Sequence, residues 1–243
     1  MGAKINRVEP RKIEIDGVEK MHGTTYRIMP DRNEAVTFAI LAALSGGNIY
    51  LKDVPMDAMK TFLDKFTEAG GSWEEDEKGI RFFFKGDIRP TDVITAPHPG
   101  FMTDWQGPWS VLTTQAQGVS TIHEAIYENR FAYVSELKKM GAKLQFFTPK
   151  VDNPEEFYNF NLEEGSDYSK QGLRITGPSS LHNAVVNIAD LRAGATLVIA
   201  ALIAKGVSII YGFEHVERGY EAFDARLKSL GASIVALSEE VQI

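Results

Sequence analysis

The chain has 243 residues, 44% of them apolar, which is typical of one large globular domain or two small ones. A formal net charge of −7 argues against general nucleic-acid binding, which needs a basic surface. The chain has no cysteine, which excludes disulfides, zinc-thiolate sites and a cysteine nucleophile within it. No apolar run reaches the roughly 18 residues of a membrane span. Residues 1–10 contain no apolar core of the kind found in signal peptides. We therefore expect a soluble, cytoplasmic protein that binds neither nucleic acid nor membrane.

The first residues read as the end of a structural unit whose beginning is missing. Gly2 and Ala3 are followed by a predicted strand over 12–15, but no helix precedes them. We expect 1–29 to be the tail end of a missing N-terminal domain. On this interpretation the chain is the C-terminal part of a longer protein, or a piece cut from one.

From 30 to 243 the sequence repeats a pattern three times, over about 30–90, 91–175 and 176–243. Each unit has an Asp before an apolar helix, then a strand, an amphipathic helix, a Gly and a further strand. The Asp and Gly residues that mark the units are Asp31 with Gly70, Asp104 with Gly141, and Asp190 with Gly231. Glycine suits the residue after a helix because it adopts positive φ at low cost.

The first helix of each unit is predicted to be the most buried. Residues 35–44 and 194–204 contain one polar residue each, and a helix that is apolar all round is buried all round. The second copy, 107–118, is more polar, so we expect it to be partly exposed or to reach a ligand.

The amphipathic helices should lie nearer the surface, at 58–69, 132–140 and 221–230. Strands are predicted at 48–54, 80–84, 119–124 and 207–211. These elements predict a pseudo-threefold α/β domain with parallel helices inside and sheets outside.

An acidic stretch, 151–173, lengthens the second unit. We interpret it as a loop or hairpin insertion, a family variation rather than a site.

Polar residues at the starts of the three buried helices predict a binding surface. If the helices run parallel, their N-termini meet on one face, which attracts anions, and Arg32 and Arg192 add charge there. Asp31 and Asp190 read as helix N-caps. Asp104 reads as functional, because the proline-rich segment 95–103 fixes the turn before it.

Two further arginines occupy equivalent places in two repeats. Arg130 lies in Glu-Asn-Arg and Arg218 in Glu-Arg-Gly, each just before an amphipathic helix. They either line one cleft or are solvated, and spacing alone does not decide between the two. The five histidines show no metal-ligand spacing, and no phosphate-loop or dinucleotide motif is present, so we expect no metal or other cofactor.

Several strings together resemble the UDP-N-acetylglucosamine 1-carboxyvinyltransferase family of enolpyruvyl transferases, which opens peptidoglycan synthesis. The strings are YRIMPDR (26–32), TAPHPGFMTDWQ (95–106), HEAIYENRF (123–131), ADLRAGATL (189–197) and HVERGYE (215–221). The resemblance runs from about Gly2 to the C-terminus. It implies an inside-out α/β barrel built from three βαβαββ units, in a two-domain enzyme that binds its substrates between the domains.

The resemblance also implies a reaction and its residues. The enolpyruvyl group of phosphoenolpyruvate moves to the 3-hydroxyl of UDP-N-acetylglucosamine, and phosphate is released. Asp104 matches the base for that hydroxyl, Ile126 a main-chain contact to the nucleotide sugar, and Arg130 and Arg218 arginines that hold the phosphoenolpyruvate anion. The catalytic residues implied are Asp104 and Arg218, and the substrate-binding set is Arg32, Thr103, Asp104, Ile126, Arg130, Asp190, Arg192 and Arg218.

The departures from the family pattern are large. The family's cysteine loop and an early Lys-Asn pair would lie in the missing half, so we expect this chain alone to be inactive or nearly so. A missing N-terminal strand could leave a sheet edge open. Two alternatives stay open: 3-phosphoshikimate 1-carboxyvinyltransferase, and a non-catalytic half-domain that binds a nucleotide sugar. The strings ENRF and RGYE favour the amino-sugar enzyme.

Overall fold

The computed structural model describes residues 1–9, 12–160, 162 and 170–237, and the chain divides into two compact units, 1–30 and 31–243. The first unit contains an antiparallel hairpin of β1 (Lys4–Glu9) and β2 (Lys12–Asp16). The second strand coincides with the predicted one. Apolar side chains of this hairpin, such as Ile15, are exposed.

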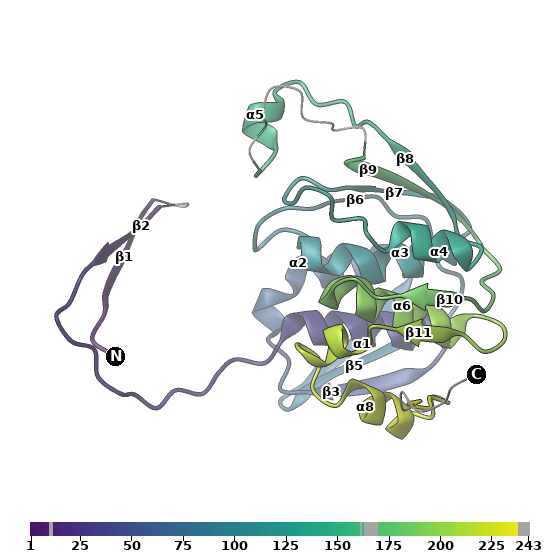
Figure 1. Cartoon of the computed structure of the whole chain (residues 1–243), viewed down its shortest axis with the longest axis horizontal. Coiled ribbons are helices and arrows are strands. Elements are labelled where there is room, and N and C mark those ends of the chain that lie inside the picture. Colours follow the sequence, from purple (N-terminus) through teal and green to yellow (C-terminus); the bar gives the residue numbers. More distant parts are fainter. Residues whose placement is uncertain (10–11, 161, 163–169, 238–243) are drawn as a thin grey trace. The chain divides into compact units, whose positions relative to one another are not determined.

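Three helices form the centre of the second unit: α1 (Arg32–Leu44), α3 (Gln106–Thr114) and α6 (Leu191–Ile203). Each packs against the other two (Figure 1). Residues 35–43 of α1 and 193–200 of α6 are buried without a break, as their apolar sequences predict. None of the helices in the described part of the chain is both long and apolar enough to cross a bilayer.

The middle helix differs from its prediction, because all nine residues of α3 are buried. Its hydroxyl groups satisfy their hydrogen-bonding needs inside the helix itself: Ser110 donates to the carbonyl of Gly107, Thr113 to that of Trp109, and Thr114 to that of Val111. A polar residue that bonds its own helix can be buried at little cost. The expectation that this helix is partly exposed was therefore wrong.

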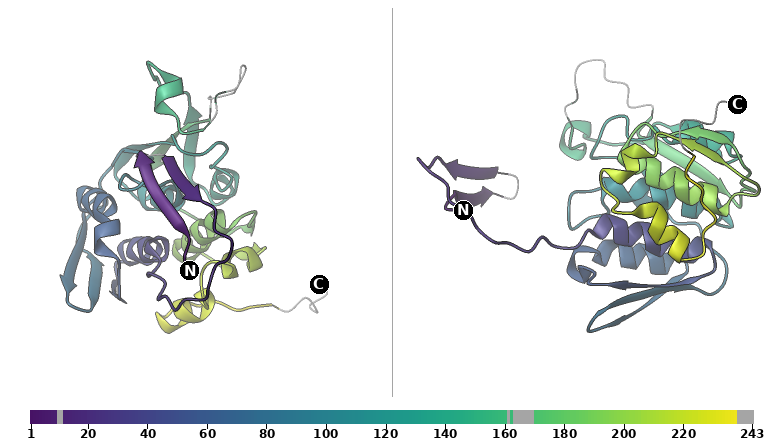
Figure 2. Two further views of the ribbon diagram at one scale, coloured as in Figure 1. Left: turned by 90° about the vertical axis from the view of Figure 1, so that its left-hand side faces the viewer. Right: turned by 60° about the horizontal axis from the view of Figure 1, so that its bottom comes forward.

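Three sheets surround the helices, one in each predicted repeat (Figures 1 and 2). The first is antiparallel, in the order β3 (Asn48–Lys52), β5 (Gly79–Phe84), β4 (Gly71–Asp76). The second runs β6 (Val93–Ile94), β7 (Gly118–His123), β9 (Gly172–Gly177), β8 (Lys143–Phe147), with only β6 and β7 parallel. The third pairs β10 (Val185–Asn187) with β11 (Ile209–Tyr211) in parallel. Helix α1 packs on β3 and β5, and α3 packs on β7 and β9, so the α/β architecture is as predicted.

The amphipathic helices lie outside this centre. They are α2 (Lys60–Glu68), which follows a 3-10 turn at Met56–Ala58, α4 (Val134–Lys139) and α8 (Phe223–Ser229), which follows the short α7 (Glu214–Glu217). The predicted glycines after these helices, Gly70, Gly141 and Gly231, have φ of +100°, +93° and +96°. Their positive φ ends each helix at the expected residue.

No strand forms after Gly231 within the described residues. Residues 232–237 have no regular structure, and Val235 is 78% exposed. In the described part of the chain, β10 and β11 pair only with each other, and Val185 and Tyr211 are exposed.

The acidic stretch 151–173 contains a helical turn, α5 (Pro154–Phe157), where a loop or hairpin was expected. The last residue of α5 and the residues after it pack against the end of β7. The Phe157 ring stacks on His123 at a centroid distance of 4.9 Å, the Tyr158 hydroxyl lies 3.0 Å from His123 Nε2, and Asn159 N–H donates to the Ala125 carbonyl. Residues 161 and 163–169 of the stretch lie outside the described residues.

The contact between α3 and α6 leaves no room for a side chain at Gly107. A Cβ there would overlap Thr196 Oγ1. We expect Gly107→Ala to lower the free energy of unfolding by roughly 1–3 kcal/mol, because overpacking outweighs alanine's better helix propensity. Chemical denaturation measures this.

Two further variants test that explanation. Thr196→Ala should restore part of the loss in the double variant, and Gly17→Ala, where a Cβ meets nothing within 4 Å, should change little. Equal losses with and without Thr196 would contradict a steric cause.

Candidate active site

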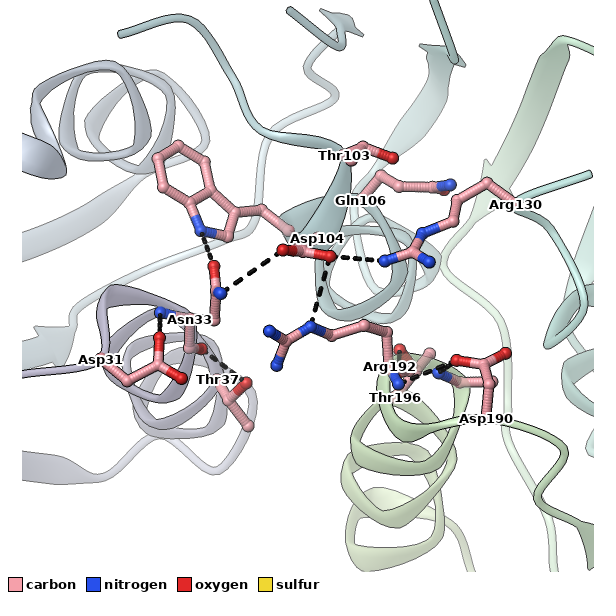
Figure 3. A network of polar contacts seen from close by, with 12 residues as sticks. Asp31, Asn33, Thr37, Thr103, Asp104, Gln106, Arg130, Asp190, Arg192 and Thr196 are labelled. Carbon is pink, nitrogen blue, oxygen red and sulfur yellow. Dashed lines mark hydrogen bonds and ion pairs between the residues drawn. The ribbon is translucent and has the colours of Figure 1, made fainter. Parts of the chain in front are cut away.

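Residues at the starts of the three central helices meet at one end of the bundle (Figure 3). Asn33 belongs to α1, Asp104 to the 3-10 turn at Thr103–Trp105 that leads into α3, and Arg192 to α6. Asn33 and Arg192 both contact Asp104. The predicted gathering of helix N-termini on one face is confirmed.

The Asp104 carboxylate is the centre of this cluster. Its Oδ1 lies 2.5 Å from Nη2 of Arg130 and 3.3 Å from Nε of Arg192. From the described residues its Oδ2 accepts one hydrogen bond, a long one of 3.4 Å from Asn33 Nδ2. Oδ2 is therefore the oxygen with spare capacity to accept a proton from a bound molecule, and the side chain is 25% exposed.

The other two aspartates are helix caps, as predicted. Asp31 Oδ1 accepts a hydrogen bond of 2.7 Å from the N–H of Asn33. Asp190 Oδ1 accepts from the N–H groups of Arg192 and Ala193, both at 2.9 Å. Asp104 caps neither its 3-10 turn nor α3, so its carboxylate faces the arginines instead.

Arg192 has hydrogen-bonding capacity to spare. Its guanidinium lies 5.9 Å from the centroid of the Tyr220 ring, and the Tyr220 hydroxyl hydrogen-bonds Thr37 on α1 at 2.8 Å. Its Nη1 is buried and has no hydrogen-bond partner among the described residues. A buried guanidinium N–H without a partner is costly, and an anion would satisfy it.

The arginines and aspartates line a cavity of only about 10 Å³, enough for about one water. Its walls are Thr103, Asp104, Gln106, Gly107, Arg130, Tyr133, Asp190, Arg192 and Ala193. A larger hollow of about 510 Å³ is lined by Ile126, Tyr127, Glu128, Asn129 and Phe160. The segment 126–130 thus borders both. The smaller cavity is too small for more than about one water, so a larger ligand could enter it only if side chains that line it move.

The structure brings together Thr103, Asp104, Arg130, Asp190 and Arg192 from the predicted set. Ile126 borders the larger hollow, but its N–H already donates to Glu124 at 2.8 Å, so only its carbonyl is free to meet a ligand.

Two predicted arginines lie outside the small cavity. Arg32 is the first residue of α1 and is half-buried. Arg218 follows α7 and is exposed. Neither lines the cavity that contains Arg130.

Sequence reasoning missed Asn33 and Glu124. Asn33 joins Asp104 to Trp105, whose indole N–H donates to the Asn33 side chain at 3.0 Å. Glu124 is fully buried and accepts hydrogen bonds from five groups, Thr103 among them. The sequence feature that could have identified Glu124 is a charged residue at the end of an apolar strand.

Within the described ranges, no three His, Asp or Glu side chains cluster so as to hold a metal ion.

Because Asp104 occupies Arg130 and Arg192, it competes with any external anion. Asp104→Asn should tighten the binding of inorganic phosphate about tenfold, since both guanidiniums lose their internal counterion. Isothermal titration at low ionic strength measures this. Asp64→Asn, on the exposed face of α2 where Asp64 pairs with Lys60, is the matched control. Weaker phosphate binding in Asp104→Asn would show that the arginines do not form an anion site.

Known proteins resemble this chain over nearly its whole length. A family model described as EPSP synthase (3-phosphoshikimate 1-carboxyvinyltransferase) matches residues 1–227. Two curated relatives are named UDP-N-acetylglucosamine 1-carboxyvinyltransferase. That of Methylacidiphilum infernorum is 36% identical over 99% of this chain and 52% of its own length. One from Caldanaerobacter subterraneus, with the number 3 in its name, is 39% identical over 98% and 52%. The chain spans about half the length of the curated relatives it matches.

Solved structures agree with this relationship. The enolpyruvyl transferase NikO from Streptomyces tendae superposes with a TM-score of 0.76 at 25% identity, over 96% of this chain and 51% of that one. EPSP synthase from Acinetobacter baumannii has a TM-score of 0.69 at 18% identity, over 98% and 53%, and supports the fold alone. The family match over most of the sequence is decisive: the chain belongs to the EPSP synthase family of enolpyruvyl transferases.

Proposed function

We propose that this chain contributes the acceptor-activating site of a UDP-N-acetylglucosamine 1-carboxyvinyltransferase. The enzyme would transfer the enolpyruvyl group of phosphoenolpyruvate to the 3-hydroxyl of UDP-N-acetylglucosamine and release phosphate. The observation that carries the proposal is the Asp104 carboxylate, held between Arg130 and Arg192 where three helices begin. The names of the relatives at 36% and 39% identity support the amino-sugar acceptor.

In the proposed reaction Asp104 is the base. Its Oδ2, which is the less engaged oxygen, would take the hydrogen bond of the acceptor hydroxyl and then its proton. As the hydroxyl oxygen bonds to the phosphate-bearing carbon of phosphoenolpyruvate, the double bond opens and the methylene carbon takes up a proton. That proton is then lost, the double bond re-forms, and the bond from the carbon to the phosphate oxygen breaks, so that phosphate leaves with the proton from the hydroxyl. No net oxidation or reduction occurs.

The arginines would hold the anion. Phosphoenolpyruvate carries a carboxylate and a phosphate, and Arg192 offers a buried N–H that lacks a partner. Arg130 would release Asp104 and turn to the same anion, as a guanidinium fork suits either group. Arg218 and Arg32, outside the small cavity, would approach the substrates from its rim, with Asp190 holding the start of α6 in place.

We further propose that catalysis needs a second domain, which supplies the nucleophile loop. The relatives are about twice as long as this chain, which supports that view. The three sheets around three central helices would then form the inside-out barrel of the family, with both substrates between the domains. A cytoplasmic location is part of the proposal, and the absence of cysteine fits a reducing compartment.

A second candidate is 3-phosphoshikimate 1-carboxyvinyltransferase, because the matching family model carries that description. A binding module without catalysis is the third. The acceptor that supports turnover separates the first two, and the absence of turnover with retained binding of UDP-N-acetylglucosamine identifies the third.

The test joins this chain to the preceding half of the Methylacidiphilum infernorum relative and measures phosphate release from phosphoenolpyruvate. We expect release that depends on UDP-N-acetylglucosamine, and little or none from this chain alone. Asp104→Ala should lower kcat by about 10²–10⁴-fold, because a general base is lost.

Circular dichroism must show that the Asp104→Ala protein remains folded. The control is Asp64→Ala, at an exposed position of α2, which should keep full activity. Full turnover by Asp104→Ala would exclude Asp104 as the base. Turnover with shikimate 3-phosphate in place of the nucleotide sugar would favour the second candidate.

A further inference from the structure

Behind the Asp104–Arg130 ion pair lies a second carboxylate, Glu124, which follows β7 directly and is 0% exposed. Five groups donate hydrogen bonds to it. Its Oε1 accepts from Thr95 Oγ1 (2.8 Å), Ile126 N (2.8 Å) and Tyr127 N (3.0 Å), and its Oε2 from Thr103 Oγ1 (2.8 Å) and Gln106 Nε2 (3.2 Å). No ion pair with Glu124 is present among the described residues.

This arrangement suits an ionised carboxylate. Burial raises the pKa of Glu124, and the hydrogen bonds it accepts counteract that rise. The N–H groups of Ile126 and Tyr127 can only donate, so a proton on Oε1 would face donors. A buried carboxylate without a cation is costly, and here the five hydrogen bonds offset part of that cost.

The donors come from the two segments that carry the site. Thr103 and Gln106 flank Asp104 in the chain, and Ile126 and Tyr127 begin the turn that ends at Arg130. Gln106 also accepts from the Tyr133 hydroxyl at 2.6 Å, which ties the network to the residue before α4. The turn itself is sharp, because Asn129 has φ of +54°. The segment that contains Asp104 and the turn that ends at Arg130 are therefore both hydrogen-bonded to the same carboxylate, that of Glu124.

We propose that Glu124 is a positioning residue: by hydrogen-bonding both segments, it sets the separation of Asp104 from Arg130 and the shape of the turn that borders the two cavities. The geometric part of this proposal stands on the contacts above. Its catalytic part rests on the proposed function.

Glu124→Gln is the first variant, because it keeps the size of the side chain and removes the charge. Its amide NH₂ must face either the N–H groups of Ile126 and Tyr127, which cannot accept, or the side chains of Thr103 and Gln106. The Thr103 hydroxyl can turn to accept but the Gln106 NH₂ cannot, so at least one of the five hydrogen bonds is lost in either orientation. Thr103→Val is the second variant and removes a single donor to Oε2, while Thr103→Ser retains the hydroxyl.

Ser120→Ala is the matched control. Ser120 is also buried on β7, and its Oγ accepts a hydrogen bond of 3.0 Å from the N–H of Thr91, away from the two segments. Its loss should cost stability without altering the site.

The experiment measures hydrogen exchange of the peptide that contains 126–130, phosphate affinity by titration, and melting temperature. Glu124→Gln should speed exchange of that peptide about tenfold and weaken phosphate binding about fivefold. Thr103→Val should show a smaller change in the same direction, and Thr103→Ser, which retains the donor, should lie closer to the unchanged protein than Thr103→Val in both readouts. Ser120→Ala should lower the melting temperature with both site readouts within about twofold of their original values.

The proposal is overturned if Glu124→Gln alters only the melting temperature, or if Ser120→Ala changes the site readouts equally. Should Glu124→Gln fail to fold, Thr103→Val and Thr103→Ser decide the matter by the same readouts. Neither exchange nor phosphate titration needs turnover, so absence of enolpyruvyl transfer would sink the proposed function and leave this test intact. If turnover is present in the joined enzyme, Glu124→Gln should lower kcat while Ser120→Ala retains it.

Discussion

Three helices, two of them almost entirely apolar, are buried against one another, and this constraint organises the whole second unit. Nine consecutive residues of α1 and all of α3 are buried, with small residues such as Gly107 at the closest contacts. Because the helices begin at the same end of the bundle, their first residues meet there. The sheets and outer helices shield the remaining surfaces, and the site occupies the end that they leave open.

At that end the charges are nearly balanced. Arg130 and Arg192 face Asp104, while Asp190 is occupied with capping α6. A net charge of −7 does not oppose the proposed anion site, because two guanidiniums are partly desolvated there whatever the total charge of the chain. In the proposed site Asp104 takes the place of an external anion between the two arginines. Glu124, without a cation of its own, holds the backbone that carries this pair.

The larger hollow beside the site has a wall from the acidic insertion. Phe160 lines it opposite the segment 126–129, and Tyr158 and Phe157 anchor that part of the insertion on His123. Members of this family share one fold and carry names with different acceptors, as the EPSP synthase and UDP-N-acetylglucosamine enzymes do.

The sequence by itself determined what depends on local chemistry. The apolar runs fixed which helices are buried, Asp31 and Asp190 preceded helices as caps, and the glycines after three outer helices have positive φ. Only the tertiary structure decided what depends on distant partners. The polar helix α3 is buried because α1 and α6 pack against it, and no strand forms over residues 232–237. Likewise Glu124 and Asn33 contact residues far along the chain. Spacing reports periodicity within one segment, whereas contacts between segments depend on how the whole chain packs.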